Sequence, residues 1–246
     1  MSDSYREQFR QSIDNPEEYW GKAASALVWT KPWEKVLDDS GAPFYEWFSG
    51  GEINTCYNAL DRHCESGRGS QAALIYDSPV TGQVQTFSYD ELLQQVSRFA
   101  GALKNNGVGK GDRVIIYMPM IPQAIISMLA CARIGAIHSV VFGGFAAKEL
   151  ATRILDAEPA LIISASCGIE GSRTIPYLPL LEEALAIAGT QDMKQILVSR
   201  PEMPIEQLPA AAMLWDKAIE NAEPAPCETV SATDPLYILY TSGTTG

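Results

Sequence analysis

The sequence predicts an α/β fold in which a mostly parallel β-sheet is flanked by helices and preceded by an irregular helical N-terminal segment that wraps around it. The first observation is that short β-rich stretches alternate with stretches of helical periodicity from about residue 67 onward. The second is that strand stretches such as "RVIIYM" are apolar after their first residue, which is typical of strands covered on both faces in a parallel sheet. The third is that residues 1–50 hold four of the five tryptophans in irregular sequence, too little chain to form a core alone. We therefore divide the chain into an N-terminal segment, 1–66, and a main body, 67–246.

The N-terminal segment is expected to contain short helices joined by irregular coil. One helix is expected to begin at Pro16, because proline is favoured at the first helical position and Asp14 and Asn15 precede it as capping residues. The stretch "INTCYNALDRHCESG" predicts another helix, capped by Asn54 and ended by Gly67.

In the main body, capping residues and glycines set the expected boundaries. Ser88 and Glu91 have the spacing of a capping box, so a helix is expected to begin there and to continue to Gly107. The expected strands are 72–77, 82–88, 113–118, 138–145 with its turn, 160–166, 195–198 and 236–242, and the expected helices are 89–107, 119–135, 146–159 and 177–188. Residues 201–226 are expected to form a connection rich in proline and alanine.

Composition limits the partners and the location of the chain. A net charge of −12 opposes binding to nucleic acid and to anionic membrane surfaces. The polar N-terminus is neither a secretory signal nor a typical transit peptide, and the apolar runs are too short to span a bilayer, so a cytoplasmic location is expected. The five cysteines show no CxxC spacing and only two histidines accompany them, so neither a disulfide framework nor a structural metal site is expected.

The stretch "LYILYTSGTTG" joins an apolar strand to a loop of glycine, serine and threonine. Gly243 and Gly246 free the backbone to curl so that successive N–H groups point inward, and the hydroxyl groups add further donors. Such a loop suits the oxygens of a phosphate chain. An ordinary polar turn is the alternative, because the stretch contains no lysine, which a phosphate loop usually has.

Two other glycine-bearing turns follow strands. In "VVFGGFAAKELATR" a strand meets a helix through two glycines, which indicates either a tight packing turn or an anion site at the helix N-terminus. The loop "CGIEGSR" lies at the carboxyl end of a strand, where open α/β sheets bind ligands, and Arg173 is there either a surface charge or an anion clamp. His63 and His138 are expected to be structural, and we assign no catalytic residue within the chain because the sequence offers no nucleophile–base pair.

Taken together, these stretches resemble one family. "YILYTSGTTG" is similar to the phosphate-loop signature of the adenylate-forming, AMP-binding superfamily. "YMPMIPQAIISMLACARIGAIHSVVFGGF", "CYNALDRH" and the tryptophan-rich N-terminal segment narrow the resemblance to the acetyl-CoA/propionyl-CoA synthetase family, and "IYDSPVTG" with "SCGIEGSR" is most similar to its propionyl-CoA synthetase branch. The resemblance covers nearly the whole chain. It implies ATP, CoA and Mg²⁺ as cofactors and a short-chain carboxylate that attacks the α-phosphate of ATP, so that an acyl-adenylate forms, diphosphate leaves and CoA then accepts the acyl group.

The resemblance also implies two groups of site residues. The first is expected to cradle the β- and γ-phosphates of ATP and consists of Thr241, Ser242, Gly243, Thr244, Thr245 and Gly246. The second is expected to bind CoA, with Phe142 and Gly144 at the adenine and Arg173 at the phosphates, and consists of Phe142, Gly143, Gly144, Glu170, Gly171, Ser172 and Arg173. Acetyl-CoA synthetases have an arginine where this chain has Glu170. A carboxylate there is expected either to repel a phosphate or to accept a hydrogen bond from a ribose hydroxyl or the adenine amine.

In that family the signature continues through a lysine and a proline. The resemblance therefore implies that the chain corresponds to the N-terminal part of a synthetase, with residues 67–246 as the first part of its large AMP-binding domain, and that these residues alone do not adenylate a carboxylate. Propionate is the expected substrate and acetate the alternative. Two further interpretations stay open: a non-catalytic module that binds CoA, and a truncated chain without function, which would expose apolar surface beside "LYILY" and aggregate.

Overall fold

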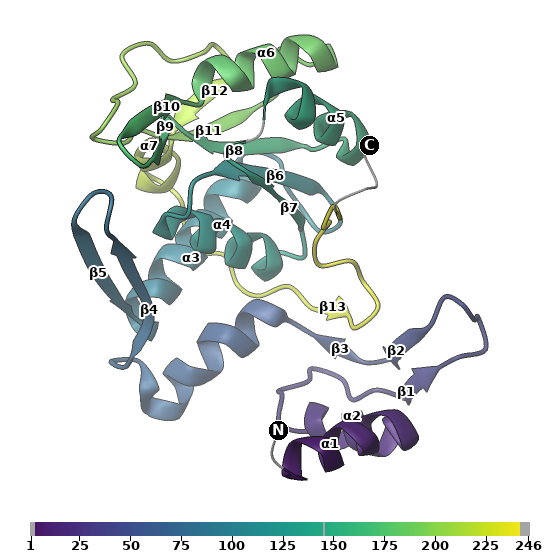
Figure 1. Cartoon of the computed structure of the whole chain (residues 1–246). Coiled ribbons are helices and arrows are strands. Elements are labelled where there is room, and N and C mark those ends of the chain that lie inside the picture. Colours follow the sequence, from purple (N-terminus) through teal and green to yellow (C-terminus); the bar gives the residue numbers. More distant parts are fainter. Residues whose placement is uncertain (1–2, 145, 242–246) are drawn as a thin grey trace.

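A computed structural model of the chain describes residues 3–144 and 146–241 (Figure 1). Phe145 and five residues of the expected phosphate loop, 242–246, lie outside the described residues. Within the described ranges, no helix is both long enough and apolar enough to cross a membrane.

A five-stranded parallel β-sheet forms the centre of the main body. Its strand order is β12–β11–β8–β6–β7, and every neighbouring pair is parallel. The predicted α/β fold with a mostly parallel sheet is therefore confirmed. The strands are β6 (Arg113–Met118), β7 (Ile137–Phe142), β8 (Leu161–Ala165), β11 (Gln195–Val198) and β12 (Ala212–Leu214).

Helices cover both faces of this sheet. On β6, Val114 and Ile116 belong to the core on the side of α3 and α4, whereas Ile115 and Tyr117 belong to the core on the side of α5 and α6. Figure 1 shows these two helix pairs on opposite sides of the strands. Burial on both faces explains why the strands are apolar at consecutive positions. The helices are α3 (Tyr89–Asn105), α4 (Pro122–Arg133), α5 (Ala147–Ala157) and α6 (Leu178–Ala188).

The chain changes direction at β6 and β7. The helix that follows β6, α4, packs on one face of the sheet, and the helix that follows β7, α5, packs on the other. The connection through α5 then returns past β6 to β8. Loops that leave adjacent parallel strands toward opposite faces open a crevice at the carboxyl ends of those strands, where α/β folds place their ligands.

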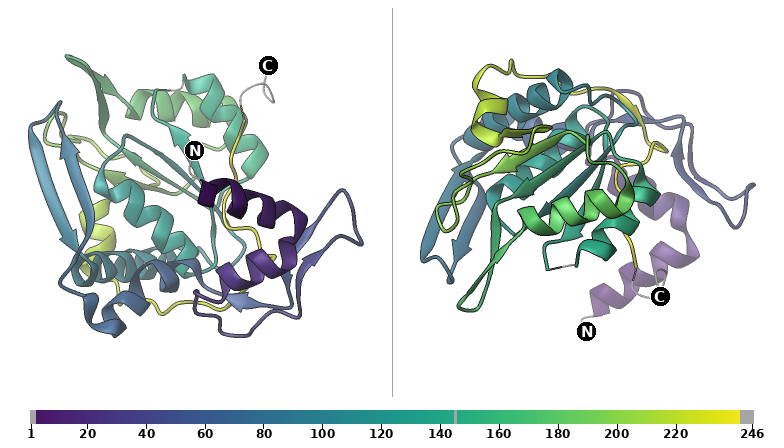
Figure 2. Two further views of the ribbon diagram at one scale, coloured as in Figure 1. Left: turned by 60° about the horizontal axis from the view of Figure 1, so that its bottom comes forward. Right: turned by 90° about the horizontal axis from the view of Figure 1, so that it is seen from above.

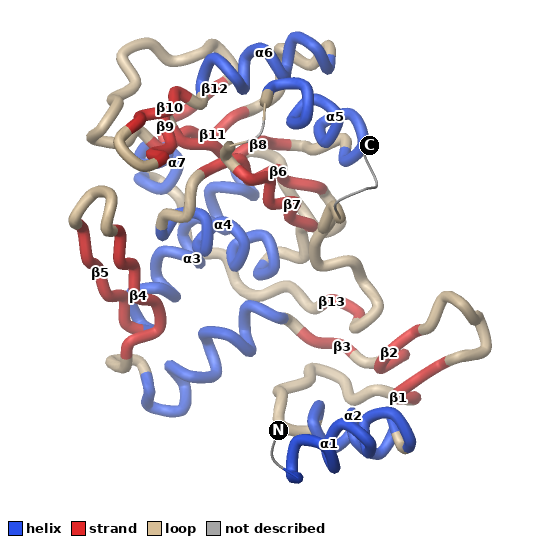
Figure 3. The backbone as a smooth tube through the Cα atoms, in the orientation of Figure 1, coloured by secondary structure: helices blue, strands red, loops and turns tan. Residues whose placement is uncertain are grey.

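Four antiparallel strand pairs surround the central sheet. Two are hairpins beside its carboxyl end, β4 (Ala72–Ser78) with β5 (Gln83–Ser88) and β9 (Cys167–Glu170) with β10 (Arg173–Pro176). The other two belong to the N-terminal segment: β1 (Lys35–Asp38) pairs with β2 (Glu46–Ser49), and β3 (Glu52–Ile53) pairs with the distant β13 (Val230–Ser231). Figure 3 shows β13 within the long irregular stretch that follows α7 (Trp215–Glu220).

The N-terminal segment begins with α1 (Asp3–Asp14) and α2 (Pro16–Ala24), which lie together on one side of the molecule in both views of Figure 2. The second helix begins at Pro16 as predicted, although Asn15 makes no side-chain capping bond. The helix predicted from "INTCYNALDRHCESG" is also present. Asn54 Oδ1 accepts a hydrogen bond from Tyr57 N at 3.0 Å, and Gly67 has a φ of +79° that ends regular helix. Much of it consists of the π-helical turns η1 (Tyr57–Asp61) and η2 (Cys64–Arg68), which periodicity alone did not predict.

Buried polar contacts fasten this N-terminal helix to the main body. Asn54 Nδ2 donates to three carbonyl oxygens, at Ala132, Arg133 and Glu228. The Arg133 guanidinium donates through both Nη atoms to the Asp61 carboxylate, at 2.8 and 3.0 Å. The two side chains are only 7% and 15% exposed, so this ion pair is part of the protein interior.

Two expectations in the C-terminal third need correction. The connection 201–226 is not irregular throughout, because it contains the edge strand β12 and the helix α7 (Trp215–Glu220). The expected strand 236–242 is not formed as such within the described residues; Tyr237 only bridges to His138 on β7 in parallel orientation. Leu239 and Tyr237 are 71% and 55% exposed, which leaves the segment without the two-sided packing that a central strand needs.

Candidate functional site

A cleft of about 500 Å³ lies at the carboxyl ends of β6 and β7. The β4–β5 hairpin forms one wall and the β9–β10 hairpin another, and the segment that follows β6 closes the base. Most of its surface is apolar, and a few polar groups lie among the apolar side chains, which is the usual composition of a small-molecule site. The lining residues are Tyr76, Ser78, Val80, Met118, Pro119, Met120, Ile121, Val140, Val141, Phe142, Gly143, Ile169, Glu170, Tyr177, Arg200 and Leu239.

Two tyrosines pack together beside this cleft, and Tyr177 is one of its lining residues. The Tyr117 hydroxyl donates to Gly143 O at 3.3 Å, and the Tyr177 ring lies 5.1 Å from the Tyr117 ring. A Cβ on either Gly143 or Gly168 would overlap the Tyr177 hydroxyl, so these two glycines let β7 and β9 approach the ring from two sides. Burial raises the pKa of Tyr117 to about 12, and burial together with the charge of Glu170 raises the pKa of Tyr177 to about 12, so both hydroxyls keep their protons at neutral pH.

Three of the seven residues expected to bind CoA line this cleft, from two separate elements. Phe142 ends β7, Gly143 follows it and Glu170 ends β9, whereas Gly171, Ser172 and Arg173 do not line the cleft. Gly144 is close by, because a Cβ on it would lie 3.1 Å from Glu170 Oε1. The expected loop 167–173 is wrong in its local structure: it is a β-hairpin whose two-residue turn is Gly171–Ser172. Gly171 has a φ of +59°, as such a turn requires, and Arg173 pairs directly across from Glu170.

Several cleft residues escaped prediction from the sequence. Arg200 follows β11, is only 7% exposed, and donates from Nη1 to Cys167 O at 3.0 Å while its Nε lies 3.3 Å from Glu202. It therefore holds β9 in place and carries a positive charge beside Glu170. The sequence signal that could have identified Arg200 is the apolar run that precedes it, because this run marks the end of a strand. Tyr177 and the β4–β5 hairpin gave no comparable signal, because only the tertiary fold brings them to the cleft.

The C-terminal segment reaches the same region and places Thr241, the one described residue of the expected phosphate loop. Leu239 lines the cleft, and the Tyr240 hydroxyl donates to Asp156 on α5. The Tyr240 ring also lies 5.0 Å below the Arg153 guanidinium. These contacts fix the backbone immediately before Thr241 beside α5. Ser242, Gly243, Thr244, Thr245 and Gly246 lie outside the described residues, so their expected role stays a prediction.

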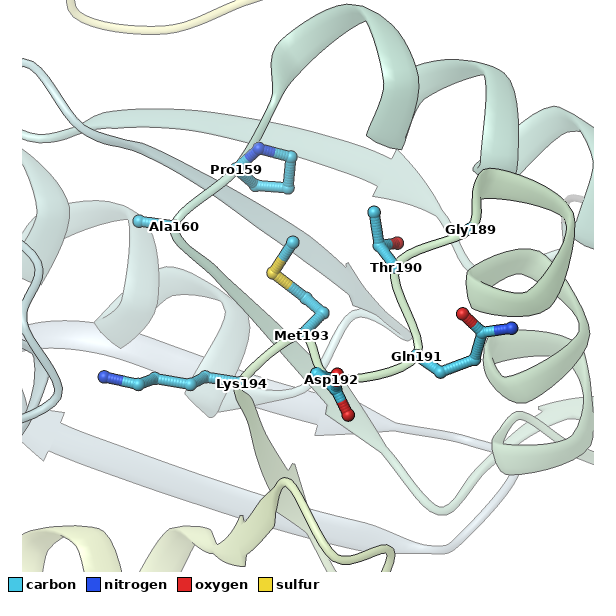
Figure 4. Close-up of a pocket in the computed structure, with 8 residues that line it drawn as sticks. All are labelled: Pro159, Ala160, Gly189, Thr190, Gln191, Asp192, Met193 and Lys194. Carbon is cyan, nitrogen blue, oxygen red and sulfur yellow. The ribbon is translucent and has the colours of Figure 1, made fainter.

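A second hollow, of about 370 Å³, lies at the other end of the strands, where β8 and β11 begin (Figure 4). It is formed where the chain enters β8 and β11, and its lining residues are Pro159, Ala160, Gly189, Thr190, Gln191, Asp192, Met193 and Lys194. Figure 4 shows the Lys194 side chain directed away from the other lining groups, and its Nζ donates to Asn106 O at 2.8 Å. The amino ends of parallel strands are not where open α/β sheets bind ligands, so we assign this hollow no function.

His138 on β7 faces the C-terminal segment and has a structural environment, as expected. Its ring lies 5.8 Å from the Tyr237 ring, and Nδ1 is buried with no hydrogen-bond partner in the described part of the chain. Burial lowers the pKa of His138 to about 4 from its ordinary value of 6.5. The imidazole is therefore neutral at neutral pH and cannot be protonated without cost.

Acidification is expected to destabilise the fold through His138. Between pH 6.5 and about 4 the unfolded chain binds a proton at this histidine and the folded chain does not, so stability falls as the pH falls through that window. Because His138 is only partly buried, its contribution to the free energy of unfolding is less than the full pKa difference would give, about 2 kcal/mol. Urea unfolding at both ends of the window should show a shallower pH dependence for His138→Phe than for the wild type. His63→Gln removes the other histidine, whose pKa burial also lowers, and should flatten the slope less than His138→Phe does. An unchanged slope in His138→Phe would contradict the assignment.

Comparison with known proteins places this geometry in a family. Residues 60–246 match the family described as AMP-binding enzyme, and residues 5–59 match the acetyl-coenzyme A synthetase N-terminus. The chain belongs to the AMP-binding enzyme family. The predicted membership of the adenylate-forming, AMP-binding superfamily is thereby confirmed. The second match covers most of the expected N-terminal segment.

Individual relatives of this AMP-binding chain are acyl-CoA or acetyl-CoA synthetases by name. It is 52% identical over 98% of its length to acyl-CoA synthetase short-chain family member 3, mitochondrial, from Bos taurus, and covers 35% of that protein. It is 45% identical over 99% of its length to an acetyl-coenzyme A synthetase from Burkholderia lata, and covers 37% of that protein. Acetoacetyl-CoA synthetase from Streptomyces lividans has a similar structure, with a TM-score of 0.85 and 26% identity over 96% of this chain and 36% of that one. The chain thus spans about a third of the length of the relatives it matches.

Proposed function

We propose that the chain contributes the CoA-binding cleft and the first phosphate contacts of an ATP-dependent short-chain acyl-CoA synthetase. The proposed reaction converts propionate, ATP and CoA to propionyl-CoA, AMP and diphosphate through an acyl-adenylate, with Mg²⁺ assisting the phosphates. The observation that carries the proposal is that Phe142, Gly143 and Glu170 meet in a cleft at the carboxyl edge of the sheet, in a chain related over its whole length to short-chain synthetases.

The chemistry of the cleft suits an adenine nucleotide with a phosphate tail. Phe142 is 66% exposed at the rim, where its ring offers an apolar surface to a flat base. Glu170 can accept hydrogen bonds from an adenine amine or a ribose hydroxyl, and Arg173, directly across the hairpin, can pair with phosphate oxygens. In this arrangement the unlike charges of Glu170 and Arg173 orient the ligand, with the base toward β7 and the phosphates toward the hairpin tip.

The residues of the chain would then act on the reaction by binding and orientation. Mg²⁺ and the expected loop 241–246 would neutralise charge on the ATP phosphates, and Tyr240 would hold the start of that loop against α5. The apolar lining from Val80 and Ile169 would exclude water from the base. Proton transfer is assigned to no residue of this chain.

Acetate is the alternative substrate, and the name of the Burkholderia lata relative favours it. A non-catalytic CoA-binding module is the alternative of another class. The cytoplasmic location stays a prediction, because the Bos taurus relative is named mitochondrial and the Burkholderia lata relative is not.

Replacing Arg173 by alanine is expected to weaken CoA binding about tenfold, because one charge-assisted contact to phosphate is lost. Isothermal titration of the 246-residue chain with CoA measures this. Arg98→Ala is the matched control, since Arg98 is an exposed arginine on α3, which does not line the cleft. Equal CoA affinity in the Arg173→Ala variant and the wild type would remove Arg173 from the site, and no CoA binding by the wild type would count against the cleft as a whole.

No carboxylate-dependent exchange of labelled diphosphate into ATP is expected from these 246 residues, with propionate or with acetate. The physical reason is that none of these 246 residues is assigned a catalytic role in the transfer of the adenylate. CoA binding without exchange supports the proposal for this part of the protein. Exchange above the level without carboxylate would refute the expectation that these 246 residues alone do not form the acyl-adenylate.

A further inference from the structure

Two thiols and a carboxylate converge where the N-terminal helix packs against the main body. Cys56 lies at the start of that helix, Asp61 lies one turn further, and Cys227 lies on the irregular stretch that follows α7. The two sulfur atoms and a carboxylate oxygen are all within 4.8 Å of one another. Cys56 is fully buried and Cys227 is partly exposed, so one sulfur of the pair can be reached from solvent and the other cannot.

Arg133 completes this cluster. Its Nη1 lies 3.7 Å from Cys56 Sγ and 2.8 Å from Asp61 Oδ2, while Nε donates to Ala225 O at 2.6 Å. Cys227 Sγ lies 3.7 Å from Asp61 Oδ2 and within 4.8 Å of Cys56 Sγ, so its one proton can be donated to either. A hydrogen bond from Cys227 and then the charge of Arg133 lower the pKa of Cys56 despite its burial, whereas the pKa of Cys227 is raised by the same contact and by burial.

The donor set could be considered for a metal ion, but the electrostatics oppose it. Both oxygens of Asp61 already accept hydrogen bonds from Arg133, and a divalent cation among the three donors would meet that guanidinium at close range. The same positive charge favours a thiolate at Cys56, which is the form that attacks a disulfide. The cluster is therefore better suited to thiol chemistry than to holding a cation.

We propose that Cys56 and Cys227 form a redox-modification site, at which a low-molecular-weight disulfide such as glutathione disulfide converts the two thiols into an intramolecular disulfide. In the first step the thiolate of Cys227, the accessible sulfur, attacks one sulfur of the small disulfide; a mixed disulfide forms, and one small thiol leaves with the proton that Cys227 lost. In the second step the Cys56 thiolate attacks the Cys227 sulfur, the mixed disulfide breaks, and a second small thiol leaves with the proton of Cys56. Two protein thiols are oxidised and one small disulfide is reduced to two thiols.

The geometry allows the second step to be fast and intramolecular. The sulfur atoms are at most 4.8 Å apart, so a disulfide bond of about 2.05 Å requires them to approach by less than about 3 Å, and Cys227 lies on an irregular stretch of backbone. Arg133 stays beside Asp61 in the product and keeps that carboxylate paired. The new bond would tie the N-terminal helix to the stretch that leads to β13, so the oxidised chain should melt at a higher temperature than the reduced chain.

The test is to incubate the 246-residue chain with glutathione disulfide at about pH 8, where thiol–disulfide exchange proceeds. Peptide mapping without reduction should find one peptide pair joined through Cys56 and Cys227. The rate should keep rising with pH over the range in which the chain stays folded, because Cys227 must lose its proton in the first step and its hydrogen bond with Cys56, together with burial, raises the pKa of that thiol. Dithiothreitol should reverse the link.

Three variants separate the proposal from unspecific oxidation. Cys56→Ser should stop the reaction at a glutathione adduct on Cys227, and Cys227→Ser should leave Cys56 unmodified. Cys64→Ser is the matched control and should still form the link, because Cys64 is also partly exposed but does not belong to the cluster of Cys56, Asp61 and Cys227. The proposal fails if the folded wild type carries only glutathione adducts, or if the link appears only in guanidinium. Because Cys227 is partly exposed, Cys227→Ser and the wild-type map still decide the matter if Cys56→Ser does not fold.

Discussion

Replacing Arg133 by methionine is expected to lower the free energy of unfolding by about 3–5 kcal/mol. The Arg133 guanidinium is 7% exposed and makes two hydrogen bonds to Asp61 and one to Ala225 O. Methionine fills much of the volume but leaves the Asp61 carboxylate unpaired in a site that is only 15% exposed to water. Denaturation by urea, followed by the fluorescence of the five tryptophans, measures the loss.

Two further variants test whether the loss of stability comes from the buried ion pair. The double variant Arg133→Met with Asp61→Asn should recover part of the lost stability, because no full charge is then left without a partner. Lys217→Met removes an exposed ion pair, Lys217–Glu220, whose side chains are 69% and 53% exposed, and should cost less than about 1 kcal/mol. If Arg133→Met costs no more than Lys217→Met, the pair does not fasten the N-terminal helix to the body.

The central sheet could be predicted from the sequence because its signals are local. The apolar run "RVIIYM" became β6 with the expected boundaries, and the capping box of Ser88 and Glu91 is present at the start of α3. Both depend on neighbouring residues alone. The turn at 171–172 carried a local signal as well, since a glycine between two short β-rich runs fits a two-residue hairpin, but the glycine was interpreted as part of a loop.

The elements that were missed are held by distant contacts. The helix α7 has only six residues, and its Trp215 ring stacks on Phe99 of α3 at 3.8 Å, a contact that no pattern within 201–226 reveals. The π-helical turns at 57–68 lie where Asn54, Asp61 and Arg133 constrain the backbone through partners far along the chain. Arg200 and Tyr177 reach the cleft for the same reason. Local sequence thus sets the sheet, and tertiary packing sets the cleft walls.

Replacing Gly143 by alanine is expected to cost about 3 kcal/mol, which is large for the addition of one methyl group. Gly143 lies in the turn after β7, and a Cβ there would overlap the Tyr177 hydroxyl and lie 2.6 Å from Cζ of the same ring. The ring cannot move away freely, because Tyr177 is 4% exposed and packs against Tyr117, while a Cβ on Gly168 would meet it from the other side. Gly109→Ala is the matched control, since the nearest atom to its Cβ would be 3.8 Å away.

The same crowding links stability to the proposed ligand site. If the tyrosine is the obstacle, Gly143→Ala should cost much less in a Tyr177→Leu background than in the wild type, and a double-mutant cycle by urea denaturation measures that coupling. Gly168→Ala should behave in the same way, because its Cβ meets the same hydroxyl. Since Gly143 lines the cleft, Gly143→Ala should also weaken CoA binding, whereas Gly109→Ala should not. If the stability costs of the two substitutions are simply additive in the cycle, a contact other than that with the Tyr177 ring holds β7 and β9 in the positions that form the cleft.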